Sequence, residues 1–357
     1  YREAIVVGPG VTEIRRLSDY NLGVKDTAND VSVYVMDSGV PGGTALILGG
    51  THPEEPQGPV STTMFIENVI PVQGRLIVCT RANRSASTVT RAGDAYPQFF
   101  EIPTEFGSRR FRMGDRWSNP LDSWPDPEVY IHYPSKQPLA YMDIRNLNRV
   151  WPGRNNGTLT ERTAAAWIDL INTENVDIVF DMHEAELEYS VISTIVAHER
   201  GADVAAMASM MLSATEFNMG MEYSPRKLHG LSHREIGDFT SALVFEIETP
   251  EPFLDRVRGV TDTALLLEGK DEFVMRAGAA GLLYEKIDEN GWPIDERVGR
   301  ANSTVYMLVQ MYNDMPPAGF DDRPIAFGGL PLRDDVVARG SGYYLRDPRT
   351  TDQVVWE

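Results

Sequence analysis

The chain has 357 residues, 42% of them hydrophobic and 24% charged, which is the composition of a globular protein that can bury a large core. No apolar run is long enough to cross a bilayer, and the net charge of −19 opposes binding to nucleic acid or to anionic membrane surfaces. We therefore expect a soluble protein without nucleic-acid or membrane partners, although a homo-oligomer is compatible with this composition.

Two further features bear on the compartment. The only cysteine, Cys79, follows the apolar residues 76–78, so we expect a buried strand residue rather than a nucleophile or half of a disulfide. The first residue is Tyr1 rather than Met, which suggests a leader or a boundary upstream. The protein is expected either in the cytoplasm or exported after removal of a leader.

The N-terminal half alternates segments that favour strands with segments that favour helices. Residues 31–35 alternate like a half-exposed strand, and turn residues at 40–43 lead into a buried strand over 45–49, which predicts a hairpin. Beyond it we expect a helix over 59–70, a strand over 75–80, a helix over 160–172 and a strand over 176–180. This order predicts an α/β fold with a mixed, largely parallel sheet and helices on both faces.

The C-terminal half continues this pattern and then departs from it. We expect helices over 203–217, 261–277 and 296–315, and a buried strand over 242–247. Residues 85–141 show neither a helical nor a strand period, which predicts an irregular insertion bordering the functional site. From 316 onward the chain is polar and is expected to lie over the surface or over a neighbouring subunit. We predict a catalytic domain over 1–280 and a C-terminal extension over 281–357, made of a helix and an extended tail.

A first candidate metal-binding segment is Gly-Gly-Thr-His52-Pro-Glu-Glu55, directly after the predicted strand 45–49. The glycine pair lets the backbone turn tightly, and Pro53 and Pro56 would stiffen the loop that directs His52 and Glu55. A His-x-x-Glu pair often occurs by chance, and a surface loop is the alternative. The position at the end of a buried strand favours a metal-binding role.

A second candidate is Asp181-Met-His183, at the end of the strand predicted over 176–180. His183 alone could be a partly buried histidine with ordinary partners. Burying Asp181 for structure alone would be costly, whereas a carboxylate that orients a metal-bound imidazole explains its place. Parallel strands lead into one crevice, so we expect His52, Glu55 and His183 to meet there. Two imidazoles and one carboxylate form a common catalytic zinc set that leaves a position for water.

Two more segments carry polar groups suited to catalysis. Arg149 offers a planar fork for a carboxylate, Asn148 is a neutral donor and Arg145 lies nearby, although an arginine tied to a surface acid is the alternative. Glu246 and Glu248 lie two residues apart, on one face of an otherwise apolar strand. A general base beside a metal-activated water explains such a pair, while one of the two could merely neutralise an arginine.

In this order the motifs resemble the zinc carboxypeptidase superfamily, and within it more closely the succinylglutamate desuccinylase and aspartoacylase branch. The matching segments, spread over roughly 45–253, are Gly49–Glu55, Leu147–Gly153, Asp181–His183 and Phe245–Ile247. The resemblance implies a carboxypeptidase-like fold with one zinc ion on His52, Glu55 and His183. It also implies Asn148 and Arg149 at the substrate and an acid or base glutamate, for which Glu246, followed by Pro252-Phe253, fits better than Glu248.

The sequence also departs from the family pattern. Tyr141 stands where relatives in the deacylase branch often carry an arginine, for which Arg145, Arg84 or Arg81 could substitute. The insertion over 85–141 is longer than the family leads us to expect, which suggests an unusual substrate. Upstream of the Glu246 strand, two histidines could reach the substrate or lie in a solvated loop: His229 and His233.

These observations predict a zinc-dependent hydrolase that cleaves an amide bond in an N-acyl amino acid or a similar small substrate carrying a carboxylate. Glu246 would shuttle the proton, and Arg149 or Arg145 would hold the oxyanion or the substrate carboxylate. One alternative is a metallocarboxypeptidase that acts on the C-termini of short peptides. An alternative of another class is a catalytically silent binding protein on the same fold.

Overall fold

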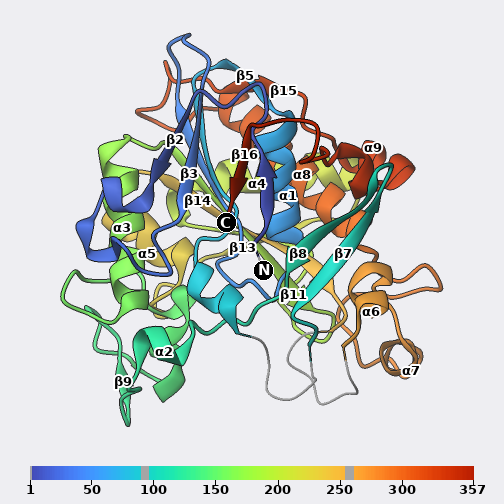
Figure 1. The fold of residues 1–357 in the computed structure, drawn as a ribbon, viewed down its shortest axis with the longest axis horizontal. Coiled ribbons are helices and arrows are strands. Elements are labelled where there is room, and N and C mark those ends of the chain that lie inside the picture. Colours follow the sequence, from blue (N-terminus) through green and yellow to red (C-terminus); the bar gives the residue numbers. More distant parts are fainter. Residues whose placement is uncertain (1, 90–95, 254–260) are drawn as a thin grey trace.

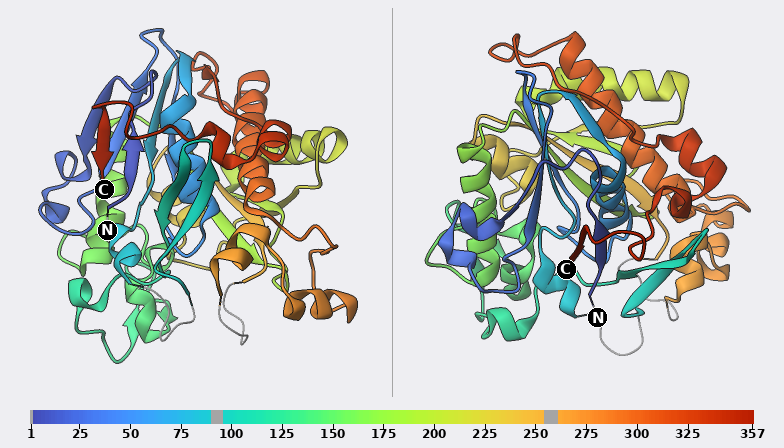
Figure 2. Two further views of the ribbon diagram at one scale, coloured as in Figure 1. Left: turned by 45° about the vertical axis from the view of Figure 1, so that its right-hand side comes forward. Right: turned by 45° about the horizontal axis from the view of Figure 1, so that its top comes forward.

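The computed structural model describes residues 2–89, 96–253 and 261–357, and it has the α/β architecture expected from the sequence (Figure 1, Figure 2). A mixed sheet of eight strands forms the centre of this described part. From edge to edge its strands are β13 (Gly220–Tyr223), β12 (Thr194–Ala197), β14 (Leu243–Glu251), β11 (Ile178–Glu186), β4 (Thr44–Leu48), β6 (Arg75–Cys79), β3 (Ser32–Asp37) and β2 (Glu13–Arg16).

The four central strands, β14, β11, β4 and β6, run parallel to one another. On either side of them β12 and β3 pair antiparallel, with β14 and β6 respectively. The α-helices of the described residues are α1 (Gln57–Asn68), α2 (Pro120–Ser123), α3 (Leu159–Thr173), α4 (Ala202–Thr215), α5 (Ser232–Phe239), α6 (Thr263–Glu268), α7 (Glu272–Ala279), α8 (Ile294–Asp314) and α9 (Arg333–Arg339). None of the helices built from described residues has the length and apolar character needed to span a membrane.

Helices cover both faces of the sheet because the strands are apolar on both sides. One core layer contains side chains of α1, α4 and α8 together with Ile178 and Phe180 of β11. The other contains side chains of α3 and α5 together with Val179; in Figure 1, α3 and α5 lie to the left of the sheet and α1 and α8 to the right. Since side chains alternate along a strand, Asp181 and His183 lie on the same face as Val179. Asp181 and His183 therefore face the layer of α3 and α5, whereas Glu184 lies on the other face and pairs with Arg297 of α8.

Helix α3 shows how local sequence sets these elements. The Thr158 hydroxyl accepts a hydrogen bond from the Glu161 backbone N–H (3.3 Å), and the Glu161 carboxylate accepts one from the Thr158 N–H (2.9 Å). This capping box satisfies donors that the first helical turn would leave unpaired. Trp167 and Leu170, three residues apart, lie on the side of the helix that packs on the sheet.

The predicted hairpin between residues 31–35 and 45–49 is wrong. The two strands form, as β3 and β4, but β6 lies between them and pairs with both. Both edges of β4 are already paired, by β6 and β11, because a strand buried on both faces is stabilised best with a neighbour on each side.

Three other expectations needed correction at their boundaries. The strand predicted over 176–180 continues to Glu186, so His183 lies within β11 rather than after it. The helix predicted over 261–277 divides into α6 and α7 because Gly269 adopts a positive φ of 67° that ends the first helix. The insertion over 85–141 includes a regular antiparallel hairpin, and its residues 90–95 lie outside the described residues.

Outside the central sheet, short strands join distant parts of the chain. β16 pairs antiparallel with β1, so the two ends of the chain lie close together in Figure 1. The buried Glu357 carboxylate accepts hydrogen bonds from the hydroxyls of Tyr34 and Thr80, both at 3.0 Å. These short strands are β1 (Ala4–Val6), β5 (Ile70–Gln73), β7 (Phe99–Thr104), β8 (Gly107–Arg112), β9 (Tyr130–Ile131), β10 (Pro138–Leu139), β15 (Ala326–Gly328) and β16 (Val354–Trp356).

The buried carboxylate of Glu67, at the end of α1, ties three of these segments together. It accepts hydrogen bonds from the backbone N–H of Val6 (3.1 Å) and of Arg346 (2.6 Å), and it pairs with Arg109 of the β7–β8 hairpin at 2.9 Å. The N-terminus, the insertion and the C-terminal tail are thereby fixed to one helix.

We predict that Arg109→Leu lowers the free energy of unfolding by about 3–5 kcal/mol, because it leaves the Glu67 carboxylate buried without its cation. Chemical denaturation monitored by circular dichroism measures this change. The neighbouring Arg110 pairs with Glu101 at the surface, where both side chains are about 40% exposed. Arg110→Leu is therefore the matched control and should cost less than about 1 kcal/mol. Equal losses for the two variants would contradict the role given to Glu67.

Candidate metal centre and substrate pocket

The first arm of the site is the loop between β4 and α1. Gly50 adopts a positive φ of 62°, and a Cβ there would approach the Thr80 carbonyl oxygen to 2.9 Å, so the tight turn after β4 requires glycine. The turn directs His52 and Glu55 over the C-terminal ends of β4 and β11. Both side chains are almost completely buried.

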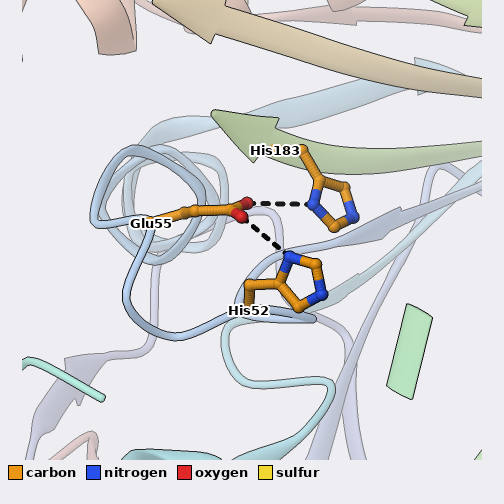
Figure 3. Close-up of side chains that lie close together, drawn as sticks. All are labelled: His52, Glu55 and His183. Atoms are coloured by element: carbon orange, nitrogen blue, oxygen red, sulfur yellow. Dashed lines mark hydrogen bonds and ion pairs between the residues drawn. The ribbon is translucent and has the colours of Figure 1, made fainter. Parts of the chain in front are cut away.

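The three predicted metal ligands meet. One oxygen of Glu55 lies 2.7 Å from His52 Nδ1 and the other lies 2.9 Å from His183 Nδ1, so the carboxylate bridges the two rings (Figure 3). The rings stand edge to face with their centroids 4.7 Å apart. Candidate ligand atoms of all three residues lie within 4.8 Å of one another. His52 and His183, which are 131 positions apart in sequence, therefore lie close enough together to coordinate one metal ion.

The outer nitrogens of both rings face hydrogen-bond acceptors. His52 Nε2 lies 2.8 Å from Asn146 Oδ1, which also accepts from the Asn148 backbone N–H and so must receive the ring proton. His183 Nε2 lies 3.0 Å from the Asp181 carboxylate, whose other oxygen accepts from the Thr51 hydroxyl at 2.7 Å. A neutral His52 therefore carries its proton on Nε2 and presents its Nδ1 lone pair, whereas His183 Nε2 lies near Asp181 without a hydrogen bond.

This arrangement leaves acceptors facing acceptors. The Nδ1 lone pair of His52 points at one oxygen of Glu55, and His183 Nδ1 lies at hydrogen-bond distance from the other oxygen, in a buried place. Such contacts are repulsive unless a proton or a metal ion lies among the three groups. Two imidazoles and one carboxylate, with acceptors behind the imidazoles, are the donor set and outer shell of a catalytic zinc site. The residues present fit a metal ion.

The electrostatics of the cluster favour positive charge. Burial acts to raise the pKa of the Glu55 carboxyl, but the two neighbouring imidazoles outweigh burial and hold that pKa below its usual range. Burial lowers the pKa of His52. Burial acts in the same direction on His183, yet the carboxylates of Asp181, Glu55 and Glu246 raise its pKa well above the ordinary value. The carboxylates around His183 therefore favour positive charge beside this ring.

A second group, Asp181, His183 and Glu246, also has its ligand atoms close together. This group contains one imidazole and two carboxylates, and Thr51 donates to Asp181 while Asn148 donates to Glu246 at 3.0 Å. The cluster centred on Glu55 contains two imidazoles and one carboxylate, a common catalytic zinc set, and is therefore the better candidate for the ion.

Glu246 and Glu248 project from β14 beside this cluster. In the parallel ladder Glu246 lies opposite Asp181 and Glu248 opposite His183, so all four side chains share one face. One oxygen of Glu246 accepts from Asn148 and from the Ser232 hydroxyl (3.1 Å), and it lies 3.8 Å from His183 Nε2. Burial, followed by the charge of Glu246, raises the pKa of Glu248 well above its usual value.

The predicted substrate-binding residues are not all in one place. Asn148 and Arg149 line the cavity in front of the metal cluster. Among the described residues, no carboxylate forms an ion pair with Arg149, whose guanidinium donates to the Asn148 carbonyl at 2.6 Å. Arg145 instead pairs with Asp126 at 2.8 Å and does not line the cavity. Of the suggested substitutes for the missing family arginine, Arg81 is buried in an ion pair with Glu3, and Arg84 does not line the cavity either.

The insertion supplies a cavity residue that the sequence did not reveal. Arg116 lines the cavity, and its Nε lies 2.6 Å from Glu54, two residues from His52. The irregular composition of 85–141 indicated a segment bordering the site, but nothing in it marked this arginine. Asn146 and Ser232 were also missed; Asn146 could have been suspected because it belongs to the same Asn-Leu-Asn-Arg run as Asn148.

The two histidines upstream of β14 have different environments. His233 is buried, lines the cavity and lies 3.7 Å from Glu246 through Nε2 and 2.8 Å from the Ser224 hydroxyl through Nδ1. His229 is partly exposed, pairs with Glu235 and does not line the cavity. The cavity has a volume of about 330 Å³.

Residues 134–248 match the family model of the succinylglutamate desuccinylase/aspartoacylase catalytic domain. The matched segment contains Asn148, Arg149, His183 and Glu246, and it confirms the resemblance drawn from the motifs. Desuccinylases and aspartoacylases are hydrolases, so the family match supports a hydrolase. No curated protein matches the chain.

Solved structures that are similar to this chain include a succinylglutamate desuccinylase and a metallo-carboxypeptidase. The ectoine utilization protein EutE (DoeB) from Ruegeria pomeroyi is 19% identical, with a TM-score of 0.36 over 60% of this chain and 52% of its own. A succinylglutamate desuccinylase from Silicibacter sp. TM1040 is 18% identical, with a TM-score of 0.37 over 64% and 55%. A metallo-carboxypeptidase from Burkholderia cenocepacia is 12% identical, with a TM-score of 0.47 over 86% and 66%. The chain thus covers little more than half the length of the first two.

We predict that His52→Ala reduces the bound metal from about one ion per chain to near none, because it removes one of the three protein ligands. Metal analysis of the purified variant by plasma mass spectrometry measures the loss. His229→Ala, which removes a partly exposed imidazole outside the cavity, is the control and should retain the ion. Stoichiometric metal in His52→Ala would show that the ligand set is wrong.

Proposed function

We propose that this protein is a zinc-dependent amidohydrolase that removes the acyl group from an N-acyl amino acid or a similar small substrate carrying a carboxylate. The observation that carries the proposal is the buried carboxylate of Glu55 between two imidazole Nδ1 atoms, with Glu246 next to His183. A hydrolytic base beside a candidate metal centre, at the bottom of a cavity, is the arrangement that amide hydrolysis needs.

His52, Glu55 and His183 would hold the zinc ion. When bound, the ion supplies Lewis acid chemistry, which lowers the pKa of a water molecule and polarises the amide carbonyl. Asn146 orients the His52 ring by accepting its Nε2 proton, and the Asp181 carboxylate lies 3.0 Å from His183 Nε2.

Glu246 would accept the proton of the attacking water and return it to the leaving amine. Asn148 and Ser232 both donate to Oε2 of Glu246, which holds the carboxylate in place. The other oxygen, Oε1, lies 3.7 Å from His233 Nε2 and is available for the transferred proton. Glu248 is two residues farther along the same face and is the second candidate for this role.

Arg149 would bind the substrate carboxylate. It lines the cavity and has no acidic partner among the described residues, whereas Arg145 is already neutralised by Asp126. A guanidinium that lines a cavity and has no ion-pair partner among the described residues can offer two donors to a substrate carboxylate.

The size of the cavity supports a small substrate. About 330 Å³ is near the lower end of the range for small-molecule sites, and it accommodates an acylated amino acid rather than several peptide residues. A metallocarboxypeptidase is the second candidate because it would use the same metal ligands. Assay of zinc-loaded protein against N-acyl amino acids and against short peptides separates the two, since release of C-terminal residues without deacylation would favour the peptidase.

We predict that Glu246→Gln keeps the metal but lowers kcat by roughly 10²–10⁴-fold, because the amide cannot accept a proton from water. Steady-state kinetics together with metal analysis test this prediction. Glu235→Gln, which alters a buried carboxylate of α5 outside the cavity, is the control and should change kcat little. Unchanged turnover in Glu246→Gln, together with loss of turnover in Glu248→Gln, would transfer the proton-accepting role to Glu248.

A further inference from the structure

Acidic residues predominate among the charged residues that line the cavity. Arg149 and Arg116 lie among the residues that surround the metal cluster, and Arg116 is neutralised by Glu54. The wall formed by β14, β12 and β13 carries the acidic residues Glu248 and Glu222, and Glu184 and Glu186 of β11 also line the cavity. A cationic group of a substrate therefore meets carboxylates at this wall, whereas a substrate carboxylate meets Arg149.

The strand register fixes where the acidic wall lies. Val196 of β12 is paired with Glu246 on one side and with Glu222 on the other, so the three side chains form one row on the face of the sheet that carries the site. Because neighbouring strands lie about 4.8 Å apart, Glu222 lies roughly 10 Å from Glu246 across Val196. In the next row Glu248 lies opposite Thr194, which is paired with Gly220, a residue without a side chain.

The two acids of this wall lack cationic partners. Oε2 of Glu248 is buried and has no hydrogen-bond partner in the part of the chain that the structure describes. Glu222 forms no ion pair with any described residue. A buried carboxylate oxygen without a donor is costly, and it is usually explained by a ligand that supplies the donor.

A tyrosine lies beside the same wall. Tyr189 lines the cavity and is about half exposed. Aromatic faces beside carboxylates attract ammonium and guanidinium groups and tolerate their alkyl stems. Val196, between Glu246 and Glu222, offers an apolar floor for such a stem.

From this wall we propose that the substrate carries a cationic group, an ammonium or a guanidinium, which binds over Val196 beside Glu222, with Glu248 in the neighbouring row. The inference rests on the proposed function and narrows its substrate class to N-acyl derivatives of basic amino acids. Arg149 binds the carboxylate of such a molecule, and the acidic wall binds the end of its side chain.

Binding of the product amino acids tests this inference without turnover. Calorimetry with the zinc-loaded protein should show that L-lysine binds at least about ten-fold more tightly than L-norleucine, which has a similar chain without the charge, and that L-glutamate binds more weakly than either. Glu222→Gln should reduce the preference for lysine over norleucine by about ten-fold and leave norleucine binding unchanged. Glu216→Gln, an exposed change outside the cavity, is the matched control and should preserve the preference.

Hydrolysis of the three Nα-acetyl derivatives separates this inference from the proposed function. Preferential hydrolysis of Nα-acetyl-lysine supports both. Hydrolysis of acetyl-norleucine or acetyl-glutamate with equal or greater kcat/KM, and no preference for lysine in binding, would overturn the cationic substrate while deacylation stands. Tight and selective binding of lysine without hydrolysis of any amide would support the cation site and overturn the deacylase.

Discussion

The site depends on one constraint: a single buried carboxylate must be shared by two imidazoles. The oxygens of Glu55 lie within 3 Å of both Nδ1 atoms, His52 Nε2 is hydrogen-bonded to Asn146, and His183 Nε2 lies 3.0 Å from the Asp181 carboxylate. A metal ion between Glu55 and the two imidazoles would make this contact attractive. Neighbouring groups hold the ligands in place: Asn146 accepts a hydrogen bond from the His52 ring, and the Glu184 backbone N–H donates to Glu55.

The sheet supplies the precision that the constraint needs. β11 and β14 are parallel neighbours in exact register over residues 178–186 and 243–251, which places the acids of one strand beside the acid and imidazole of the other. Alternation along β11 sends Ile178, Phe180 and Met182 into one core layer and places Asp181 and His183 on the opposite face, which carries the site. A rigid strand holds His183 and Glu246 more firmly than a loop could, and only His52 and Glu55 depend on a loop.

A buried ion pair connects the site to the C-terminal part of the chain. Arg297 of α8 pairs with Glu184 at 2.8 Å, and both side chains are fully buried. Burial raises the pKa of Glu184 to about 7, against the influence of Arg297. The other oxygen of Glu184 accepts from the Gln57 backbone N–H at the start of α1, and the Glu184 N–H donates to Glu55. Helix α8, which we assigned to an extension from the sequence, therefore contacts the residue next to His183.

The sequence predicted the features that depend on local pattern. Apolar runs and their polar ends located β4, β11 and β14, and the rule that parallel strands open into one crevice predicted that His52, Glu55 and His183 meet. Prediction from the sequence failed for features that depend on contacts between distant segments. No local signal shows that β6 separates β3 from β4, that Arg116 reaches the cavity or that Arg145 pairs with Asp126. The acidic wall depends on the order β14, β12, β13, which periodicity cannot supply.

Anomalous X-ray diffraction would show where the metal ion binds. Data collected above and below the zinc absorption edge, from crystals of zinc-loaded protein, locate the ion independently of any assumed ligand. We expect a single strong peak within about 2.3 Å of His52 Nδ1, His183 Nδ1 and a Glu55 oxygen. A peak elsewhere in the cavity, or no peak at these three residues in protein that retains hydrolytic activity, would contradict it.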